Sequence, residues 1–275
     1  MKSFKMTKTL AATLIMAAMM TSCGTTAGKE SSVTSAAQSD SKTAAANSGA
    51  ITYAMEDESA AIKNAPAYDV AEAKKYIDSM PEIRELVDSY ELKPDGITTF
   101  GEKAPSDDAL DNLYKEVQKL SEGDHKVSLI MVDLKAKSGV AYNTSQPMCT
   151  QSTIKAIYVG SLLDSDPDAL NENGAYMREA IEFSANDPYH NLREIYGTEP
   201  LVKWCKEVGV DEGFTEQLYP RTYTVKEMFK MWTKLYCFLN SDDVPGNFGA
   251  YYADSSCSAA KKQLGGRFPV QIGRA

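Results

Sequence analysis

Apolar residues surround one predicted helix on every side, which is the pattern of a helix buried inside a protein core. The helix follows Ser152 and has the sequence TIKAIYVGSLL over residues 153–163. A surface helix would carry a single apolar stripe, so we expect this one at the centre of the fold. Its one charged residue is Lys155. Burial disfavours the ammonium form and lowers the pKa of a lysine, so Lys155 is predicted to be an amine that can accept a proton.

Ser152 lies one helical turn before Lys155, at the predicted start of the same helix. A serine hydroxyl there would have a nearby base and the positive end of a helix, which together favour a nucleophile. The same S-x-x-K spacing recurs from Ser39 and from Ser258, so the spacing alone is a weak signal. Only Ser152 follows a predicted hairpin and begins an apolar helix.

The hairpin is predicted from two short β patterns. Residues 127–133 read VSLIMVD, and a turn at Gly139 leads into a second short strand at 140–142. Helical patterns precede and follow this hairpin, so the chain combines helices with a small antiparallel sheet. We expect helices over 70–90 with an interruption at Pro81, over 106–120 with Ser106 as N-cap, over 201–208 before Gly209, and after the capping box of Thr224 and Glu227.

A second polar motif lies in the stretch EFSANDPYHNLREIYG. Asp187 can cap a helix that Pro188 begins, which would leave Ser184 and Asn186 in the turn before that helix. Taken by itself, the tripeptide could also be an ordinary capped polar loop.

The order of hairpin, S-x-x-K helix and S-x-N turn resembles the penicilloyl-serine hydrolases, the superfamily of the penicillin-binding proteins, and especially their class A β-lactamase-like branch. The resemblance extends from about Ser106 to the C-terminus. It implies an α+β fold of the β-lactamase/transpeptidase type, with a mainly helical subdomain and an antiparallel sheet. It also implies that Ser152 is acylated and that Lys155 transfers its proton. Ser184 would relay a proton to the leaving nitrogen, and Asn186 would bind the substrate amide and orient Lys155.

Three departures from the family pattern bear on activity. Ala185 stands where S-D-N has an Asp, which is tolerable because the outer two residues face the site. The E-x-x-L-N loop, whose Glu activates the deacylating water, has no match, and Glu216 is a poor candidate for that role. The K-T-G or K-S-G strand motif is also missing, because Lys137-Ser-Gly139 precedes Ser152. We therefore expect a chain truncated before that motif, with a sheet incomplete at its C-terminal side.

The N-terminus has the features of an export signal. Residues 1–22 carry lysines near their start and contain an apolar run at 10–20. That run is too short to span a bilayer. The sequence MTSC at its end resembles a lipobox, which implies that Cys23 is lipidated. Residues 23–65 are rich in Ser, Thr and Ala and would form a disordered tether. We expect a helical extension at 66–105, the hydrolase domain at 106–275, and a location on the outer face of the bacterial cytoplasmic membrane or in the periplasm.

Charge and composition limit the partners. The chain has a formal net charge of −9. The charged residues of the predicted signal are all basic, so its removal would make the chain more acidic, and nucleic acid is an unsuitable partner. The sequence has two histidines and no C-x-x-C or H-E-x-x-H pattern, so we predict no metal site and no cofactor. An even number of cysteines besides Cys23 permits disulfides without specifying them, and a buried free thiol is expected for Cys205; the four are Cys149, Cys205, Cys237 and Cys257.

The leading activity is the opening of a β-lactam amide through an acyl-enzyme on Ser152, by a monomer that acts on a β-lactam or a peptidoglycan-peptide-like substrate. One alternative is a penicillin-binding or D-Ala-D-Ala peptidase-like acyl transferase that deacylates slowly. Another is a cell-wall-associated lipoprotein without turnover. A Cys149 nucleophile with His125 or His190 as base is a weaker rival, because neither histidine lies in a Cys-hydrolase signature. The helical middle of the chain argues against a two-lobed transport lipoprotein.

Overall fold

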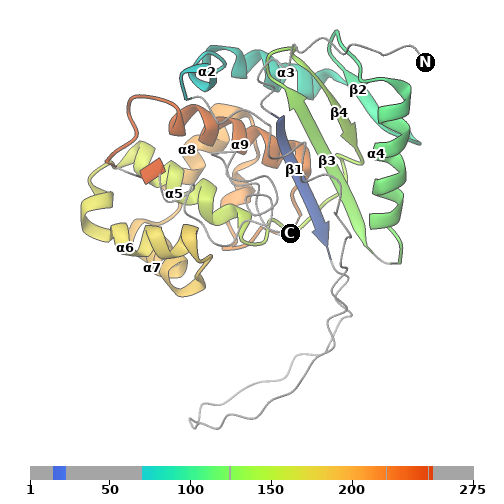
Figure 1. The fold of residues 1–275 in the computed structure, drawn as a ribbon. Coiled ribbons are helices and arrows are strands. Elements are labelled where there is room, and N and C mark those ends of the chain that lie inside the picture. The colour runs from blue at the N-terminus through green and yellow to red at the C-terminus, as the bar shows by residue number, and fades with distance from the viewer. Residues whose placement is uncertain (1–14, 23–69, 124, 221, 247, 250–275) are drawn as a thin grey trace, which may run out of the picture.

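The computed structural model describes residues 15–22, 70–123, 125–220, 222–246 and 248–249. These residues form a small antiparallel sheet that is covered by helices on both faces (Figure 1). The α+β class expected from the sequence is confirmed for the described part of the chain.

The sheet has the strand order β1-β3-β4-β2. The predicted hairpin is confirmed as β3 (Lys126–Asp133) and β4 (Ser138–Tyr142), which pair antiparallel. On the far side of β4 lies β2 (Thr98–Phe100), a strand that the sequence did not predict because three residues are too few to show an alternating pattern. A Cβ atom at Gly139 would lie 2.3 Å from the Met131 carbonyl oxygen and 2.6 Å from the Phe100 ring, so the close packing of these strands requires glycine there.

Strand β3 alternates between two hydrophobic clusters, one on each face of the sheet. Val127 and Leu129 pack in the cluster that includes Val117 of helix α4 (Asp107–Leu120). Ile130 and Val132 belong to the larger cluster, which the other helices share. Successive side chains of a strand point to opposite faces, so burial on both faces explains why this strand is apolar almost throughout.

The other edge of β3 is paired with β1 (Ile15–Ser22), which lies within the segment 1–22 expected as an export signal (Figure 1). Ile15 pairs with Asp133, and Ser22 pairs with Lys126. A short apolar run suits an edge strand as well as the apolar region of a signal peptide. Export and cleavage therefore stay predictions, and Cys23 and the tether at 23–65 lie outside the described residues.

The N-terminal helices pack on the same core as the rest of the described chain. They are α2 (Val70–Lys74), the short 3-10 helix η1 (Ile77–Ser79) and α3 (Met80–Ser89). The predicted interruption at Pro81 is misplaced, because the break precedes α3 and Pro81 lies in the first turn of that helix, where its missing N–H is harmless. Three residues of α3 are fully buried: Met80, Ile83 and Val87.

The predicted central helix is α5 (Thr153–Ser165), and it packs against α6 (Ala169–Glu182), α8 (Glu199–Val208) and α9 (Val225–Leu239). All of its residues from 153 to 163 are buried, as its apolar pattern predicted. At Gly160 a Cβ atom would lie 2.5 Å from the side chain of Leu235 on α9, so a small residue lets the two helices approach closely.

The predicted helix ends are confirmed at three places. Ser106 accepts a hydrogen bond from the Ala109 amide at the start of α4. Gly209 ends α8 in the left-handed conformation, with φ of 65°. Thr224 and Glu227 form the reciprocal capping box at the start of α9.

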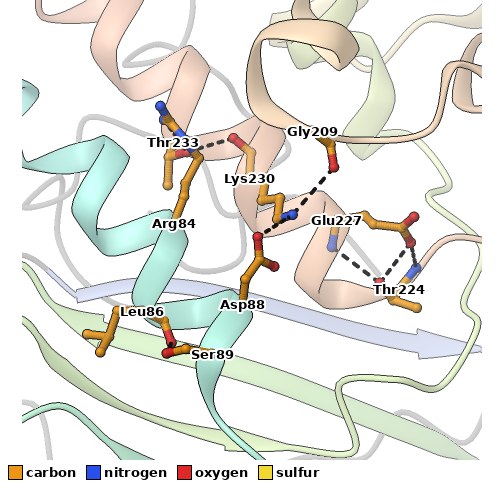
Figure 2. A network of polar contacts seen from close by, with 9 residues as sticks. All are labelled: Arg84, Leu86, Asp88, Ser89, Gly209, Thr224, Glu227, Lys230 and Thr233. Atoms are coloured by element: carbon orange, nitrogen blue, oxygen red, sulfur yellow. Dashed lines mark hydrogen bonds and ion pairs between the residues drawn. The ribbon is translucent and has the colours of Figure 1, made fainter.

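Polar contacts join α3 to α9, and α9 to the end of α8 (Figure 2). The Asp88 carboxylate lies 2.6 Å from Lys230 Nζ, which also donates to the Gly209 carbonyl oxygen at 3.4 Å. Arg84 donates to Thr233 Oγ1 at 3.1 Å. The Lys230 side chain is only 11% exposed, so its ammonium group depends on these partners.

We expect Asp88→Ala to lower the free energy of unfolding by about 1–2 kcal/mol, because it removes the carboxylate from a largely buried ammonium group. Glu82→Ala on the same helix is the matched control. It removes an ion pair with Lys137 in which both side chains are substantially exposed, and it should cost less than about 1 kcal/mol. Urea unfolding of the full chain measures both values, and equal losses would contradict the role given to Asp88.

Candidate active site

Lys155 is the buried charged residue around which the candidate site is built. Its relative exposure is 1%, which confirms the burial predicted from the sequence. Its Nζ atom donates to the Ser184 carbonyl oxygen at 2.5 Å and to Asn186 Oδ1 at 2.7 Å, and it lies 3.5 Å from Ser184 Oγ. The two sequence motifs, which are separated by about eight helical turns of chain, therefore meet at one amine.

Ser152 stands at the N-cap position of α5, with its side chain partly exposed. Its hydroxyl makes no capping hydrogen bond, although serine is a favoured capping residue. The Lys155 amide donates to the Ser152 carbonyl oxygen at 3.2 Å, which fixes the two residues one turn apart. Gln151 before it has a left-handed φ of 49°. Ser152 therefore stands at the positive end of a buried helix, and the residue is partly exposed to solvent.

The Ser184–Asn186 turn differs from the prediction in one respect. Helix α7 (Asn186–Tyr196) begins at Asn186 with Ala185 as its N-cap residue, so Asp187 is not the cap and Pro188 is not the first helical residue. Pro188 lies within the first turn, where no amide hydrogen bond is needed. Ser184 takes a left-handed φ of 56°. This reversal at Ser184 turns its carbonyl group and the Asn186 side chain toward the same amine.

Sequence reasoning missed Tyr219, and it treated His190 only as a partner for Cys149. The Tyr219 hydroxyl donates to Asn186 Oδ1 at 2.9 Å and lies 3.4 Å from His190 Nε2. The Lys155 Nζ atom is 5.8 Å from the centre of the Tyr219 ring. His190 follows Asn186 by four residues on α7, so helical spacing could have placed it here. Tyr219 lies in an irregular segment where the sequence carries no comparable signal.

The segment before α9 is attached to the rest of the site on two sides. The Thr150 amide donates to the Pro220 carbonyl oxygen at 2.8 Å, and Met148 forms a β-bridge with Tyr223. From α7, the Tyr189 hydroxyl donates to the Leu218 carbonyl oxygen at 2.8 Å. These bonds hold Tyr219 between the strand-like approach to Ser152 and the helix that carries Asn186.

The phenol of Tyr219 is a proton donor at neutral pH. Burial, and next the nearby Asp187 carboxylate, raise the pKa of Tyr219 above its ordinary value. Glu216, the carboxylate considered from the sequence, is exposed at the C-terminal end of the 3-10 helix η2 (Glu212–Thr215). Tyr219 is therefore the residue that this segment contributes to the contacts of Asn186.

The other sequence candidates lie in different settings. Lys137, the lysine of the K-S-G sequence, lies in the β3–β4 turn and forms an ion pair with Glu82. It therefore has a different setting from the amine of Lys155. Cys149 is partly exposed, and His190, the histidine considered as its base, lies within hydrogen-bond distance of the Tyr219 hydroxyl. Ser39, Ser258 and Cys257 lie outside the described residues.

Within the described ranges no group of three His, Cys, Asp or Glu side chains could hold a metal ion. No helix among those residues has the length and apolar character needed to cross a membrane. Comparison with known proteins finds no matching family model, no matching curated protein and no matching solved structure.

Cysteine reactivity should separate the core from the surroundings of Ser152. Burial raises the pKa of the Cys205 thiol to about 12, so at pH 8 its thiolate fraction should be roughly a thousandfold below that of an exposed cysteine. Iodoacetamide at pH 8, followed by peptide mass mapping, should label the partly exposed Cys149 first and Cys205 only after unfolding in urea. Equal labelling of Cys205 in native and unfolded protein would contradict the packing of α8.

Proposed function

We propose that this protein is a serine hydrolase of the class A β-lactamase type, which opens a β-lactam amide through an acyl-enzyme on Ser152. The observation that carries the proposal is the pair of hydrogen bonds from buried Lys155 to the Ser184 carbonyl oxygen and Asn186 Oδ1, one turn from Ser152 at a helix start. This geometry supports the resemblance that the order of the sequence motifs suggested.

The proposed acylation begins with Lys155 in its neutral form. A neutral amine has two N–H groups, which suit the two short acceptors, and a lone pair that can take the Ser152 hydroxyl proton. Ser152 Oγ then attacks the lactam carbonyl carbon. The carbonyl–nitrogen bond breaks, and a proton passes to the leaving nitrogen by way of Ser184 Oγ, which lies 3.5 Å from Lys155 Nζ. The product of this step is an ester on Ser152.

A second candidate is a penicillin-binding or D-Ala-D-Ala peptidase-like acyl transferase with slow deacylation. The observation that favours it is that the segment before α9 brings the protonated phenol of Tyr219 to Asn186, while Glu216, the carboxylate considered as the base for water, is exposed at the end of η2. Both candidates use the same acyl-enzyme and a small amide substrate from a β-lactam or a peptidoglycan-like peptide. Both also fit the proposed export of the chain and a lipid anchor at Cys23, on the outer face of the membrane.

Intact-mass spectrometry of the full chain with benzylpenicillin tests the proposal. We expect an adduct of the mass of the drug on the wild type, mapped to Ser152, and its loss in Ser152→Ala. Lys155→Met, which keeps a similar volume, should reduce the adduct formation rate by at least about a hundredfold because the base is gone. Circular dichroism of each variant confirms that it is folded.

The time course decides between the two candidates. A transient adduct with accumulating penicilloate indicates hydrolytic turnover, whereas a lasting adduct indicates the slow acyl transferase. An unmodified, folded wild-type protein would overturn both and favour a lipoprotein without turnover.

A further inference from the structure

We infer that Tyr219 is a positioning residue, which fixes the orientation of the Asn186 side-chain amide and through it the amine of Lys155. This inference rests on the proposed function, since it assigns a role within the same site. Its structural part, the orientation of one amide, can be measured without any substrate.

The oxygen and nitrogen of an asparagine amide have nearly the same shape, so the neighbouring donors and acceptors decide which way the group points. Here Asn186 Oδ1 accepts from Lys155 Nζ at 2.7 Å and from the Tyr219 hydroxyl at 2.9 Å. Two donors that converge on one oxygen favour this orientation over the flipped one. In the flipped orientation the amide nitrogen would face the N–H group of Lys155 donor to donor.

Lys155 alone cannot hold this orientation throughout the proposed reaction. As a neutral amine it has a lone pair, and that lone pair could accept from the Asn186 amide nitrogen in the flipped state. A second donor that keeps its proton removes this freedom. The Tyr219 hydroxyl meets the requirement, because a tyrosine with its ordinary pKa of about 10 is protonated at neutral pH, and burial raises the pKa of Tyr219 further.

The position of Tyr219 is itself defined by the backbone on both sides. The next residue, Pro220, accepts from the Thr150 amide, two residues before Ser152. The preceding residue, Leu218, accepts from the Tyr189 hydroxyl on α7. The phenol therefore connects two parts of the site, the segment before Ser152 and the helix α7 that carries Asn186. The Nε2 atom of His190, also on α7, lies 3.4 Å from the phenol oxygen.

The orientation also sets what Asn186 offers to a substrate. Asn186 Oδ1 already accepts from two protein donors. Within the described part of the chain, Nδ2 is therefore the polar atom of this exposed side chain that is left for a ligand. A substrate that engages Asn186 should therefore present a hydrogen-bond acceptor, such as an amide carbonyl oxygen, at that place.

Tyr219→Phe, which removes only the hydroxyl, tests the inference, with Tyr196→Phe as the matched control. The Tyr196 hydroxyl bonds Asn173 and Glu172 at the other end of α7, away from the amine. We expect Tyr219→Phe to slow acylation by benzylpenicillin about 3- to 10-fold, as loss of one hydrogen bond predicts, and Tyr196→Phe to leave the rate unchanged.

Nuclear magnetic resonance supplies the readout that a general loss of stability would not change. The side-chain amide signals of Asn186, identified by their absence in Asn186→Asp, should shift or double in Tyr219→Phe and stay in place in Tyr196→Phe. Unchanged Asn186 signals in Tyr219→Phe would overturn the inference, whether or not the wild type is acylated. Signals that shift in a protein that penicillin does not acylate would support the inference and reject only the proposed function.

Discussion

The arrangement of the site depends on the hydrogen bonds of one buried amine. Lys155 is enclosed in a helix whose neighbours are apolar, and an amine in that position is tolerated only if its donors are bonded. The acceptors come from Ser184, in the turn between α6 and α7, and from Asn186, the first residue of α7. The same bonds therefore satisfy the amine and fix the turn against the start of α5.

The conformation of that turn follows from this requirement. Ser184 has a left-handed φ, which is uncommon for a residue other than glycine and must be held by its surroundings. Its carbonyl oxygen and side chain both face Lys155 Nζ. Helix α5 is fixed in turn by α6, α8 and α9, so its N-cap residue Ser152 lies at a defined place near the surface. The packed helices thus present the polar groups, as a preorganised site requires.

Much of the fold could be predicted because it depends on local patterns. The all-round apolar helix, the hairpin and the caps at Ser106, Gly209 and Thr224 each have a periodicity or a cap residue that can be read along the chain. The start of α7 was misplaced by two residues, because Pro188 is compatible with several positions of a first turn. Strand β2 was missed because it is held by pairing to β4 and has no pattern of its own.

The candidate site was predictable only where a motif carried it. Lys155, Ser184 and Asn186 come together as the order of the motifs suggested. Tyr219 enters through the path of an irregular segment, whose backbone bonds to Thr150 and Tyr189 have no sequence signature. Whether residues 15–22 serve as an edge strand or as part of an export signal depends on export and cleavage, which a local apolar pattern does not encode.

The most direct test of the central claim is a double-mutant cycle on the free energy of unfolding, with Lys155→Met and Asn186→Ala measured singly and together by urea unfolding. If the buried amine bonds the Asn186 side chain, the two changes should couple by about 1–2 kcal/mol, as expected for the hydrogen bond of a buried donor. The pair of Lys155→Met with Tyr196→Phe serves as the control and should be additive. Additive effects in the first cycle, within about 0.5 kcal/mol, would contradict the claim that Lys155 joins α5 to the turn of Ser184 and Asn186.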